Sequence, residues 1–277
     1  MPDILIEGLL FGEGPRWHQD ALWLSDMHAQ QVLRVAEDGT KEIIVELAND
    51  QPSGLGWLPS GDLLIVSMTD RALLRYDGYE LAVHADLSEL ASWYCNDMVV
   101  DQHGRAYVGN FGFDLHTNAP VKTAELICVE PDGATRVVAE DLAFPNGTVI
   151  TPDGKTLIVG ESFGAKLTAF TIEDNGNLRD GRTWANLPEG AVPDGICLDD
   201  AGGIWCASPT SNECLRLTEG GEVTHRITLE RLGIACMIGG DKLYVLTSTS
   251  SHPEECKARQ DARVEIYDAP YPAAGWP

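Results

Sequence analysis

Six positions recur along the chain at a nearly constant spacing, and most of them carry side chains that can bind a cation. They are Glu13, Ser53, Asn96, Asn146, Asp194 and Cys236, and successive members are 40, 43, 50, 48 and 42 residues apart. Flanking prolines and glycines mark them as equivalent, as in Pro52-Ser53-Gly54, Pro145-Asn146-Gly147 and Pro193-Asp194-Gly195. If the repeats are arranged around one axis, these six side chains (the ring positions) face one another.

Four ring positions together could bind a divalent metal ion: Glu13, Asn96, Asn146 and Asp194. They offer two carboxylates and two amide oxygens, and two negative charges balance one divalent cation. Ligation by oxygen alone suits Ca²⁺, Mg²⁺ or Mn²⁺ better than a structural Zn²⁺ ion, which prefers His and Cys. Four protein ligands leave coordination positions for water and substrate, as a catalytic metal requires. The sequence therefore predicts one divalent ion. The ligand type favours Ca²⁺ and leaves Mn²⁺, Mg²⁺, Fe²⁺ and Zn²⁺ open.

The same triplets allow a simpler interpretation. Pro-Asn-Gly and Pro-Asp-Gly are common turn sequences and need no function. For any single repeat, this turn preference is the stronger explanation. Four ligand-type residues at the same phase of four repeats favour a site instead.

The segments between ring positions predict four short strands in each repeat. A strand starts at the ring position, for example over residues 96–100, 146–150 and 194–198. Eight residues after four of the ring positions, a glycine opens a second strand: Gly61, Gly104, Gly154 and Gly202. A third strand and a fourth strand follow, bounded by Gly, Asp, Asn and Pro. Four strands at a period of about 40 to 50 residues are the pattern of a β-propeller blade.

The two ends of the chain predict how the ring closes. The sixth repeat ends at Tyr267 without a fourth strand, and the run over residues 4–9 precedes the first ring position. Pairing these ends would remove the open sheet edges that invite aggregation. We therefore expect an all-β, six-bladed β-propeller with four antiparallel strands per blade, closed by the N-terminal strand. It would occupy residues 1–277 as a single domain.

The charge of the chain limits its partners. The formal net charge is −24, from 43 acidic and 19 basic residues, which argues against nucleic acid and against anionic membrane surfaces. No apolar run is long enough to span a membrane. The first residues carry no basic side chain, so they do not resemble a secretion signal. We expect a soluble cytoplasmic protein with a small-molecule substrate; the oligomeric state is left open.

Three other motifs predict no separate chemistry. Residues 160–164 match the G-x-S-x-G nucleophile elbow, but that elbow needs a strand-to-helix turn, and residues 165–170 read as a strand. Asn146-Gly147-Thr148 matches a glycosylation sequon, but its asparagine would face the channel. The seven cysteines form no C-x-x-C pair and several lie in apolar strands, which is typical of buried free thiols.

The motifs in this order resemble the SMP-30/gluconolactonase/LRE-like family. The resemblance rests on five segments: Glu13-Gly14-Pro15-Arg16-Trp17, Asn96-Asp97 with Asp101 and Gly104-Arg105, Pro145-Asn146-Gly147 with Pro152-Asp153-Gly154-Lys155, Glu161-Ser162, and Pro193-Asp194-Gly195. It implies a six-bladed propeller with one divalent metal in the channel and, for characterised members, sugar lactonase activity. It also implies that Glu13, Asn146 and Asp194 bind the metal. Asn96 would lie beside the metal and touch substrate, and Asp194 would be the catalytic acid or base.

One position departs from the pattern of the sugar lactonases. They often carry an arginine two residues before the Asn96 position, where this chain has Tyr94. An aromatic side chain there replaces a guanidinium group that contacts substrate hydroxyls. The loop with Phe111 and His116 adds further aromatic surface. We therefore expect Tyr94, Phe111, His116 and Asn96 to contact a less polar or aromatic substrate.

These residues predict a metal-dependent hydrolase acting on a lactone or related ester. The metal would polarise the carbonyl and activate water, and Asp194 would act as general base. Asn96 and Asn146 would help to position the oxyanion. Two alternatives stay open: a phosphotriesterase-like hydrolase that uses the same metal site, and a metal-stabilised binding propeller without catalysis.

Overall fold

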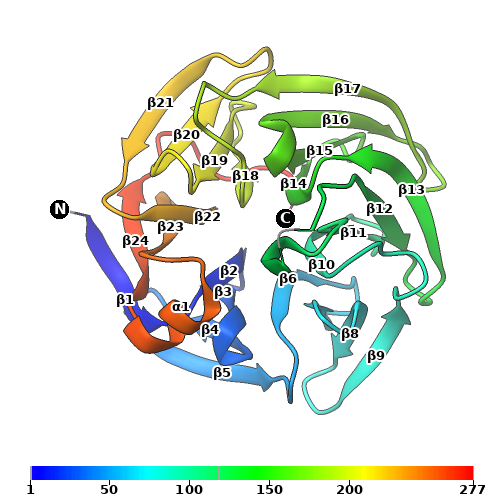
Figure 1. The fold of residues 1–277 in the computed structure, drawn as a ribbon, viewed down its shortest axis with the longest axis horizontal. Helices are drawn as coiled ribbons and strands as arrows, with labels where there is room; N and C mark the ends of the chain where they lie inside the picture. Colours follow the sequence, from blue (N-terminus) through cyan, green and yellow to red (C-terminus); the bar gives the residue numbers. More distant parts are fainter. Residues whose placement is uncertain (1, 118, 277) are drawn as a thin grey trace.

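The structure is a computed structural model that describes residues 2–117 and 119–276, apart from the side chain of His116. Six four-stranded antiparallel sheets surround a central channel, so the predicted six-bladed propeller is confirmed (Figure 1). Blade one is formed by β2 to β5, and the following blades continue in chain order. The sixth blade combines β22, β23 and β24 with the N-terminal strand β1.

The strands take four places in the blades. The innermost strands are β2 (Gly12–His18), β6 (Pro52–Trp57), β10 (Cys95–Val100), β14 (Pro145–Ile150), β18 (Ile196–Leu198) and β22 (Leu232–Gly239). The second strands are β3 (Ala21–Asp26), β7 (Leu63–Ser67), β11 (Ala106–Asn110), β15 (Thr156–Glu161), β19 (Ile204–Ser208) and β23 (Lys242–Ser248). The third strands are β4 (Gln31–Val35), β8 (Ala72–Tyr76), β12 (Ala124–Val129), β16 (Lys166–Ile172), β20 (Glu213–Leu217) and β24 (Ala262–Asp268). The outermost strands are β5 (Lys41–Glu46), β9 (Leu81–Asp86), β13 (Thr135–Leu142), β17 (Leu178–Asn186), β21 (Val223–Thr228) and β1 (Asp3–Leu9).

Short helical segments lie in loops between second and third strands. They are the 3₁₀ turns η1 (Met27–Ala29), η2 (Leu115–Thr117) and η3 (Ser162–Gly164), and the helix α1 (Pro253–Arg259). The strand pattern did not predict α1, because a helix of 7 residues is too short to show a sustained 3.6-residue period. Among the described residues, no helix has the length and apolar character needed to cross a membrane.

The N-terminal strand closes the ring as expected. β1 pairs antiparallel with β24, with Ile4 opposite Glu265 and Glu7 opposite Arg263. The last blade therefore combines the first strand of the chain with its last three strands (Figure 1). This pairing gives the sixth blade its fourth strand, so β24 is covered by β1 and is not an open sheet edge.

The glycines that open the second strands have the backbone conformation that the repeat predicts. Their φ angles are +93° at Gly61, +83° at Gly104, +69° at Gly154 and +75° at Gly202. Residues with a Cβ rarely adopt positive φ, so glycine makes these turns without strain. The outer strand of the second blade begins later than the apolar residues at 79–83 would predict. Tyr79 and Glu80 instead form a turn whose amides bond Asp77, and β9 begins at Leu81.

Two of the ring triplets, Pro52-Ser53-Gly54 and Pro145-Asn146-Gly147, are parts of strands, whereas Pro193-Asp194-Gly195 directly precedes β18. Pro145-Asn146-Gly147 lies at the start of β14, and Gly147 approaches the next blade so closely that a Cβ would lie 2.5 Å from the Ile196 amide nitrogen. A Cβ on Gly54 would likewise lie 2.5 Å from the amide nitrogen of Met98. The glycines after the ring positions thus allow neighbouring inner strands to meet. The turn interpretation is therefore wrong for Pro145-Asn146-Gly147, which is the start of a strand.

Burial differs strongly between the inner and outer strands. Every residue of β10 and β14 is buried, because both faces of an inner strand are covered by neighbouring blades. The outermost strand β21 instead alternates between half-buried and exposed residues. The inner strands are therefore held rigidly on both sides, and their ends form a fixed frame for side chains at the channel mouth.

The C-terminal segment lies at the opposite end of the channel. Ile150 at the end of β14 exchanges backbone hydrogen bonds of 2.8 and 3.0 Å with Trp276. Ala274 bonds the carbonyl of Leu198 at the end of β18. Because the ring positions lie at the start of the inner strands, this tail leaves their end of the channel uncovered.

Candidate active site

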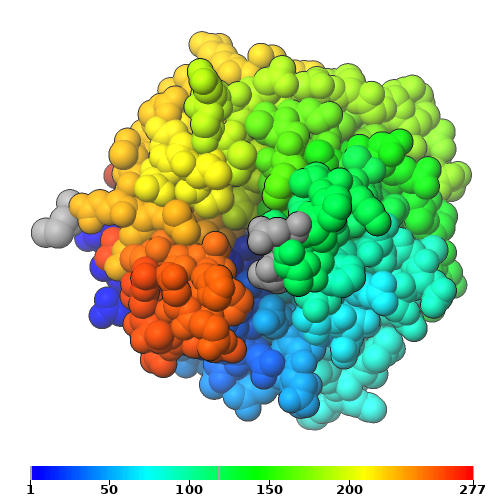
Figure 2. All heavy atoms as spheres, viewed as in Figure 1, coloured from blue at the N-terminus to red at the C-terminus, as the bar shows by residue number. Residues whose placement is uncertain are grey.

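A cavity of about 480 Å³ lies at the channel end where the inner strands begin. Figure 2 shows this face, with a hollow at its centre between the orange segment around α1 and the green segment around η2. The four residues expected to bind a metal, Glu13, Asn96, Asn146 and Asp194, all line the cavity. Tyr94 and Phe111 line it too. The predicted role of His116 falls on a side chain outside the described part of the structure.

A shift in pairing register occurs near the start of five of the six inner strands, all except β18. The pairing register shifts between Glu13 and Arg16 in β2, between Cys95 and Met98 in β10, and between Pro145 and Thr148 in β14. Before β18, Asp194 and Gly195 both bond the backbone of Ala207. Bulges of this kind redirect a side chain and are common next to active sites. At Glu13, Asn96 and Asn146 the register shift accompanies a ring residue that lines the cavity.

The sixth ring position is Ile234, not Cys236. In β22 the register shift lies between Gly233 and Ala235, and Ile234 lines the cavity. The Ile234 carbonyl accepts a hydrogen bond from the Gly195 amide at 2.9 Å, just as the Asp194 carbonyl accepts one from Gly147 at 3.2 Å. Cys236 was predicted in place of Ile234, two residues earlier in the same strand. Alternate residues of a strand share a face, and no proline-glycine triplet marks the ring position of this blade.

Cys236 and Ser53 lie behind the cavity rather than on its lining. Cys236 is 1% exposed, and its Sγ lies 3.8 Å from the Sγ of Cys197. Ser53 is also 1% exposed, and its carbonyl accepts a hydrogen bond from the Ser25 hydroxyl. All seven cysteines are free and buried, as the sequence predicted.

A hydrogen-bond network joins the fourth and fifth blades at the floor of the cavity. The amide nitrogen of Asn146 donates to Asp194 Oδ1 at 2.7 Å and to the Ser162 hydroxyl at 3.2 Å. Ser162 in turn donates to the Pro193 carbonyl at 2.7 Å. Ser162 follows β15 and precedes the strand β16, so the helix of a nucleophile elbow is absent there. Its hydroxyl positions Asn146 and the segment that carries Asp194.

The amide nitrogens of the two ring asparagines are already used within the protein. Asn96 donates to the Pro145 carbonyl at 3.3 Å, and both hydrogens of the Asn146 amide are taken by Asp194 and Ser162. Asn146 therefore has no amide hydrogen left for an oxyanion, which corrects the role expected for it. Its carbonyl oxygen, which can only accept or bind a cation, is the atom left for chemistry.

Another acidic residue near the floor is neutralised by an arginine. Arg16 Nη2 lies 2.7 Å from Asp97 Oδ1, and both side chains are buried. Arg16 also donates to the carbonyls of Leu55 and Met98, so it ties blade one to blades two and three. With Asp97 paired in this way, Glu13 and Asp194 are the carboxylates that face the cavity without a cationic partner among the described residues.

These two carboxyl groups hold their protons unusually well. Loss of solvation on burial, followed by the negative charges of Asp194 and Asp97, raises the pKa of Glu13 well above its ordinary value. Burial likewise raises the pKa of Asp194 to about 7, although the hydrogen bond from Asn146 lowers it. Two like charges in a poorly solvated site are costly, and a bound cation would offset that cost.

The donor set fits a cation that prefers oxygen ligands. The described residues contain no group of three or more His, Cys, Asp and Glu side chains placed to hold a metal. The floor instead combines two carboxylates with amide oxygens, which are ligands of Ca²⁺ and similar ions rather than of a structural zinc site. Glu13, Asn146 and Asp194 are thus the residues that could hold a metal, with Asn96 beside them.

Most of the cavity wall was missed by the sequence analysis, yet it follows two rules. The residue two positions before a ring position lines the cavity in five blades: Phe11, Gln51, Tyr94, Phe144 and Val192. The loops after the second strands supply others: Met27, His28, Met68, Thr69, Phe111, Leu115, Ser162, Phe163, Pro209, Ser251 and Pro253. These five residues precede the inner strands at a constant offset from the ring positions, so the first rule could have been read from the repeat.

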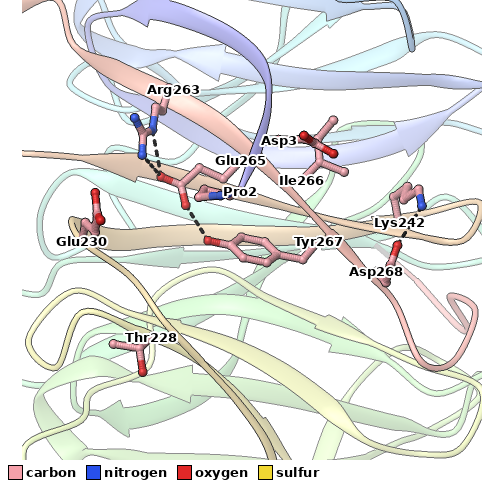
Figure 3. A pocket seen from close by; sticks show the side chains of 10 residues that line it. All are labelled: Pro2, Asp3, Thr228, Glu230, Lys242, Arg263, Glu265, Ile266, Tyr267 and Asp268. Atoms are coloured by element: carbon pink, nitrogen blue, oxygen red, sulfur yellow. Dashed lines mark hydrogen bonds and ion pairs between the residues drawn. The ribbon is translucent and has the colours of Figure 1, made fainter.

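A second cavity, of about 550 Å³, lies between the outer strands of the fifth and sixth blades (Figure 3). Its buried carboxylate, Glu265, accepts two hydrogen bonds from Arg263, at 2.6 and 2.8 Å, and one from the Tyr267 hydroxyl at 2.7 Å. Lys242 pairs with Asp268 at 2.8 Å. These groups satisfy one another, so the outer cavity is held by ion pairs and is not the candidate active site.

The fold and the channel mouth together define a class of protein: a six-bladed propeller with acidic and amide side chains on the floor of an apolar cavity. The chain belongs to the SMP-30/Gluconolactonase/LRE-like family, whose model matches residues 11–252.

Similar proteins cover most of the chain. Regucalcin of Gallus gallus is 25% identical over 287 residues, which are 95% of this chain and 95% of that protein. Pentonolactonase XacC of Haloferax volcanii is 26% identical over 201 residues, or 71% of this chain and 66% of that protein. The crystal structure of a calcium-binding protein, regucalcin from Agrobacterium tumefaciens, has the same fold. It superimposes with a TM-score of 0.78 at 18% identity, over 99% of this chain and 97% of that one.

Proposed function

We propose that this protein is a divalent-metal-dependent hydrolase that opens a lactone or a related ester. The observation that carries the proposal is the pair Glu13 and Asp194, two carboxyl groups that face one cavity without a cationic partner among the described residues. Membership of a family that includes gluconolactonases supports the reaction class, as does the similarity to a pentonolactonase.

Glu13, Asn146 and Asp194 would hold the metal, with Asn96 beside it. When bound, the ion supplies a Lewis acid for the carbonyl oxygen and lowers the pKa of water. The oxygen donors favour Ca²⁺, and the calcium-binding regucalcin of the same fold supports that choice.

The protein groups would divide the remaining work. Asp194 is the general base, because one of its oxygens is fixed by Asn146 and the other is left to take a proton. Ser162 holds the Asn146 amide so that its carbonyl oxygen, rather than its nitrogen, is directed to other partners. Asn96, anchored through its nitrogen to Pro145, offers a carbonyl oxygen and one N–H to the substrate.

The test combines metal analysis with activity. Purified protein is assayed for bound metal and then screened against lactones and esters, with and without chelator and with each candidate ion restored. We expect turnover that chelator abolishes, and a loss of about 10²–10⁴-fold in Asp194→Asn, the usual contribution of a general base. Glu80→Gln, an exposed change in the turn before β9, is the matched control.

Two outcomes would overturn the proposal. Full metal-dependent turnover in a folded Asp194→Asn variant would remove Asp194 from the reaction. If no lactone or ester is turned over with any ion but phosphotriesters are hydrolysed, the phosphotriesterase alternative is favoured. If none of these substrates is turned over, a binding propeller is favoured.

A further inference from the structure

We propose that the substrate carries an aromatic or bulky apolar group that lies against four rings of the cavity wall. These rings, Tyr94, Phe111, Phe144 and Phe163, are called the aromatic wall. The inference rests on the hydrolase function proposed above and adds the class of substrate: a lactone or ester with an apolar substituent rather than a polyhydroxylated sugar lactone.

The aromatic wall is a continuous packed surface. Ring centroids lie 6.4 Å apart between Tyr94 and Phe111, 4.5 Å apart between Phe111 and Phe144, and 5.2 Å apart between Phe144 and Phe163. Further rings support it from behind: Trp93 stacks on Tyr94 at 5.1 Å, and Phe113 meets Phe163 at 5.3 Å. Rings packed in this way keep their positions, so the wall is a preformed surface for a flat apolar group.

The wall stands beside the groups that would do the chemistry. Tyr94 lies two residues before Asn96 on the third blade, and Phe144 two residues before Asn146 on the fourth. A substrate whose apolar substituent contacts these rings would therefore have its reacting group over the polar floor. The wall also reaches the surface, because Phe163 is 50% exposed and Leu115 beside the mouth is 38% exposed. Large exposed apolar side chains at a cavity mouth mark a binding surface.

The rest of the lining offers little to sugar hydroxyls. Among the described residues that line the cavity, none is a lysine or arginine. The Ser162 hydroxyl donates to Pro193, and the Thr69 hydroxyl donates to Asp50. Phe11, Met27 and Ile234 add apolar surface from the first and sixth blades. Outside the floor, the other polar lining side chains are Gln51, His28, Ser251 and Tyr94. A sugar ring that lay against the aromatic wall would give up water at its hydroxyls without donors or acceptors from the phenylalanine rings in return, which is unfavourable.

The experiment compares three δ-lactones: glucono-δ-lactone, δ-valerolactone and dihydrocoumarin, whose ring is fused to a benzene. Each kcat/KM is divided by the rate constant for hydroxide hydrolysis of the same lactone, which removes differences in intrinsic reactivity. We expect the normalised kcat/KM for dihydrocoumarin to be about 100-fold higher than that for gluconolactone. An apolar group that fits a pocket changes kcat/KM by about this factor. A higher normalised value for gluconolactone would overturn the inference and leave the hydrolase function standing.

Phe163→Ser tests the wall directly. Phe163 is half exposed, so the variant should fold, which thermal unfolding verifies. We expect KM for dihydrocoumarin to rise about 10-fold while gluconolactone kinetics change less than 2-fold. Tyr79→Ser, which removes a ring that is 97% exposed in the turn before β9, is the matched control. Equal effects of Phe163→Ser on both lactones would contradict the proposal.

A binding measurement separates failure of this inference from failure of the proposed reaction. The probe is 2-tetralone, the carbocyclic analogue of dihydrocoumarin, which has no ester to hydrolyse. If no lactone is turned over but 2-tetralone binds and Phe163→Ser weakens it, the apolar site stands and the hydrolase function fails. If 2-tetralone does not bind, or binds both proteins equally, the aromatic wall is not a binding surface.

Discussion

The side-chain amide of Asn146 donates a hydrogen bond of 2.7 Å to the carboxylate of Asp194, which joins two neighbouring blades at the channel mouth. The two residues are 48 positions apart in the chain, yet both stand at the ring position of their blade. The contact lowers the pKa of Asp194 against the larger effect of burial. Asn146 thus keeps the carboxylate ionisable near neutral pH.

Removing the Asn146 donor should raise the pKa of Asp194. In metal-free protein we expect Asn146→Leu to move this pKa from about 7 upward by roughly one unit, because a donor to the charged form is lost. Carbon-13 NMR titration of the aspartate carboxyl groups measures the shift. Asn96→Leu is the control, since Asn96 donates to the Pro145 carbonyl and not to Asp194. A similar shift in both variants would mean that general loss of polarity, and not this hydrogen bond, sets the pKa.

The raised pKa of Asp194 predicts how stability changes with pH. The ordinary pKa is 3.8 and the folded value about 7, so between these pH values the folded state holds more protons than the unfolded state. The contribution of Asp194 to the free energy of unfolding is therefore full below about pH 4 and is lost as pH rises through 7. Because the carboxyl group is partly exposed to the cavity, we expect the free energy of unfolding to fall by about 1–2 kcal/mol, less than the full pKa difference would give.

The measurement is thermal unfolding of chelated protein between pH 4 and pH 8, compared with Asp194→Asn. We expect the wild-type melting temperature to fall relative to the variant as pH rises. Added Ca²⁺ should reverse the fall, because a cation offsets the repulsion between the carboxylates. Parallel pH profiles for the two proteins would show that Asp194 carries no such penalty.

Glu13 should control metal affinity. Mutation of a residue that hydrogen-bonds a metal ligand lowers metal affinity by about 10–100-fold. Glu13→Gln removes the charge of the ligand itself, so it should lower the affinity by at least about 100-fold. Isothermal titration calorimetry with Ca²⁺ measures the effect in chelator-treated protein. Glu80→Gln, which removes an exposed charge far from the channel, should bind as the wild type does. Unchanged affinity in Glu13→Gln would exclude Glu13 as a ligand.

The fold could be predicted because the repeat constrains backbone geometry that only certain residues satisfy. Gly104 must take a positive φ, and Gly147 must let an adjacent blade approach, so the same residues return in each blade. The sixth ring position was predicted wrongly because Ile234 is followed by Ala235, whereas a glycine follows Ser53, Asn146 and Asp194. Cys236 shares its strand face and has the more polar side chain.

The chemistry of the floor was easier to predict than the shape of the cavity. Charge and ligand type are properties of single residues, so Glu13 and Asp194 stood out in the sequence. Phe163 lines the cavity only because a 3₁₀ turn after β15 brings it to the mouth, and no local pattern encodes that approach. Phe144 was accessible to reasoning, since it lies two residues before Asn146, as Tyr94 does before Asn96.

The Arg16–Asp97 pair should stabilise the frame that holds the site. Arg16→Met leaves the Asp97 carboxylate buried without its cation, and removing one partner of a buried pair costs about 3–5 kcal/mol. Urea denaturation measures the loss. The double variant Arg16→Met, Asp97→Asn should be more stable than Arg16→Met alone, because the unpaired charge is gone while the amide can still accept from Met98. If the double variant is no more stable, then the hydrogen bonds from Arg16 to the carbonyls of Leu55 and Met98, rather than its charge, hold the three blades together.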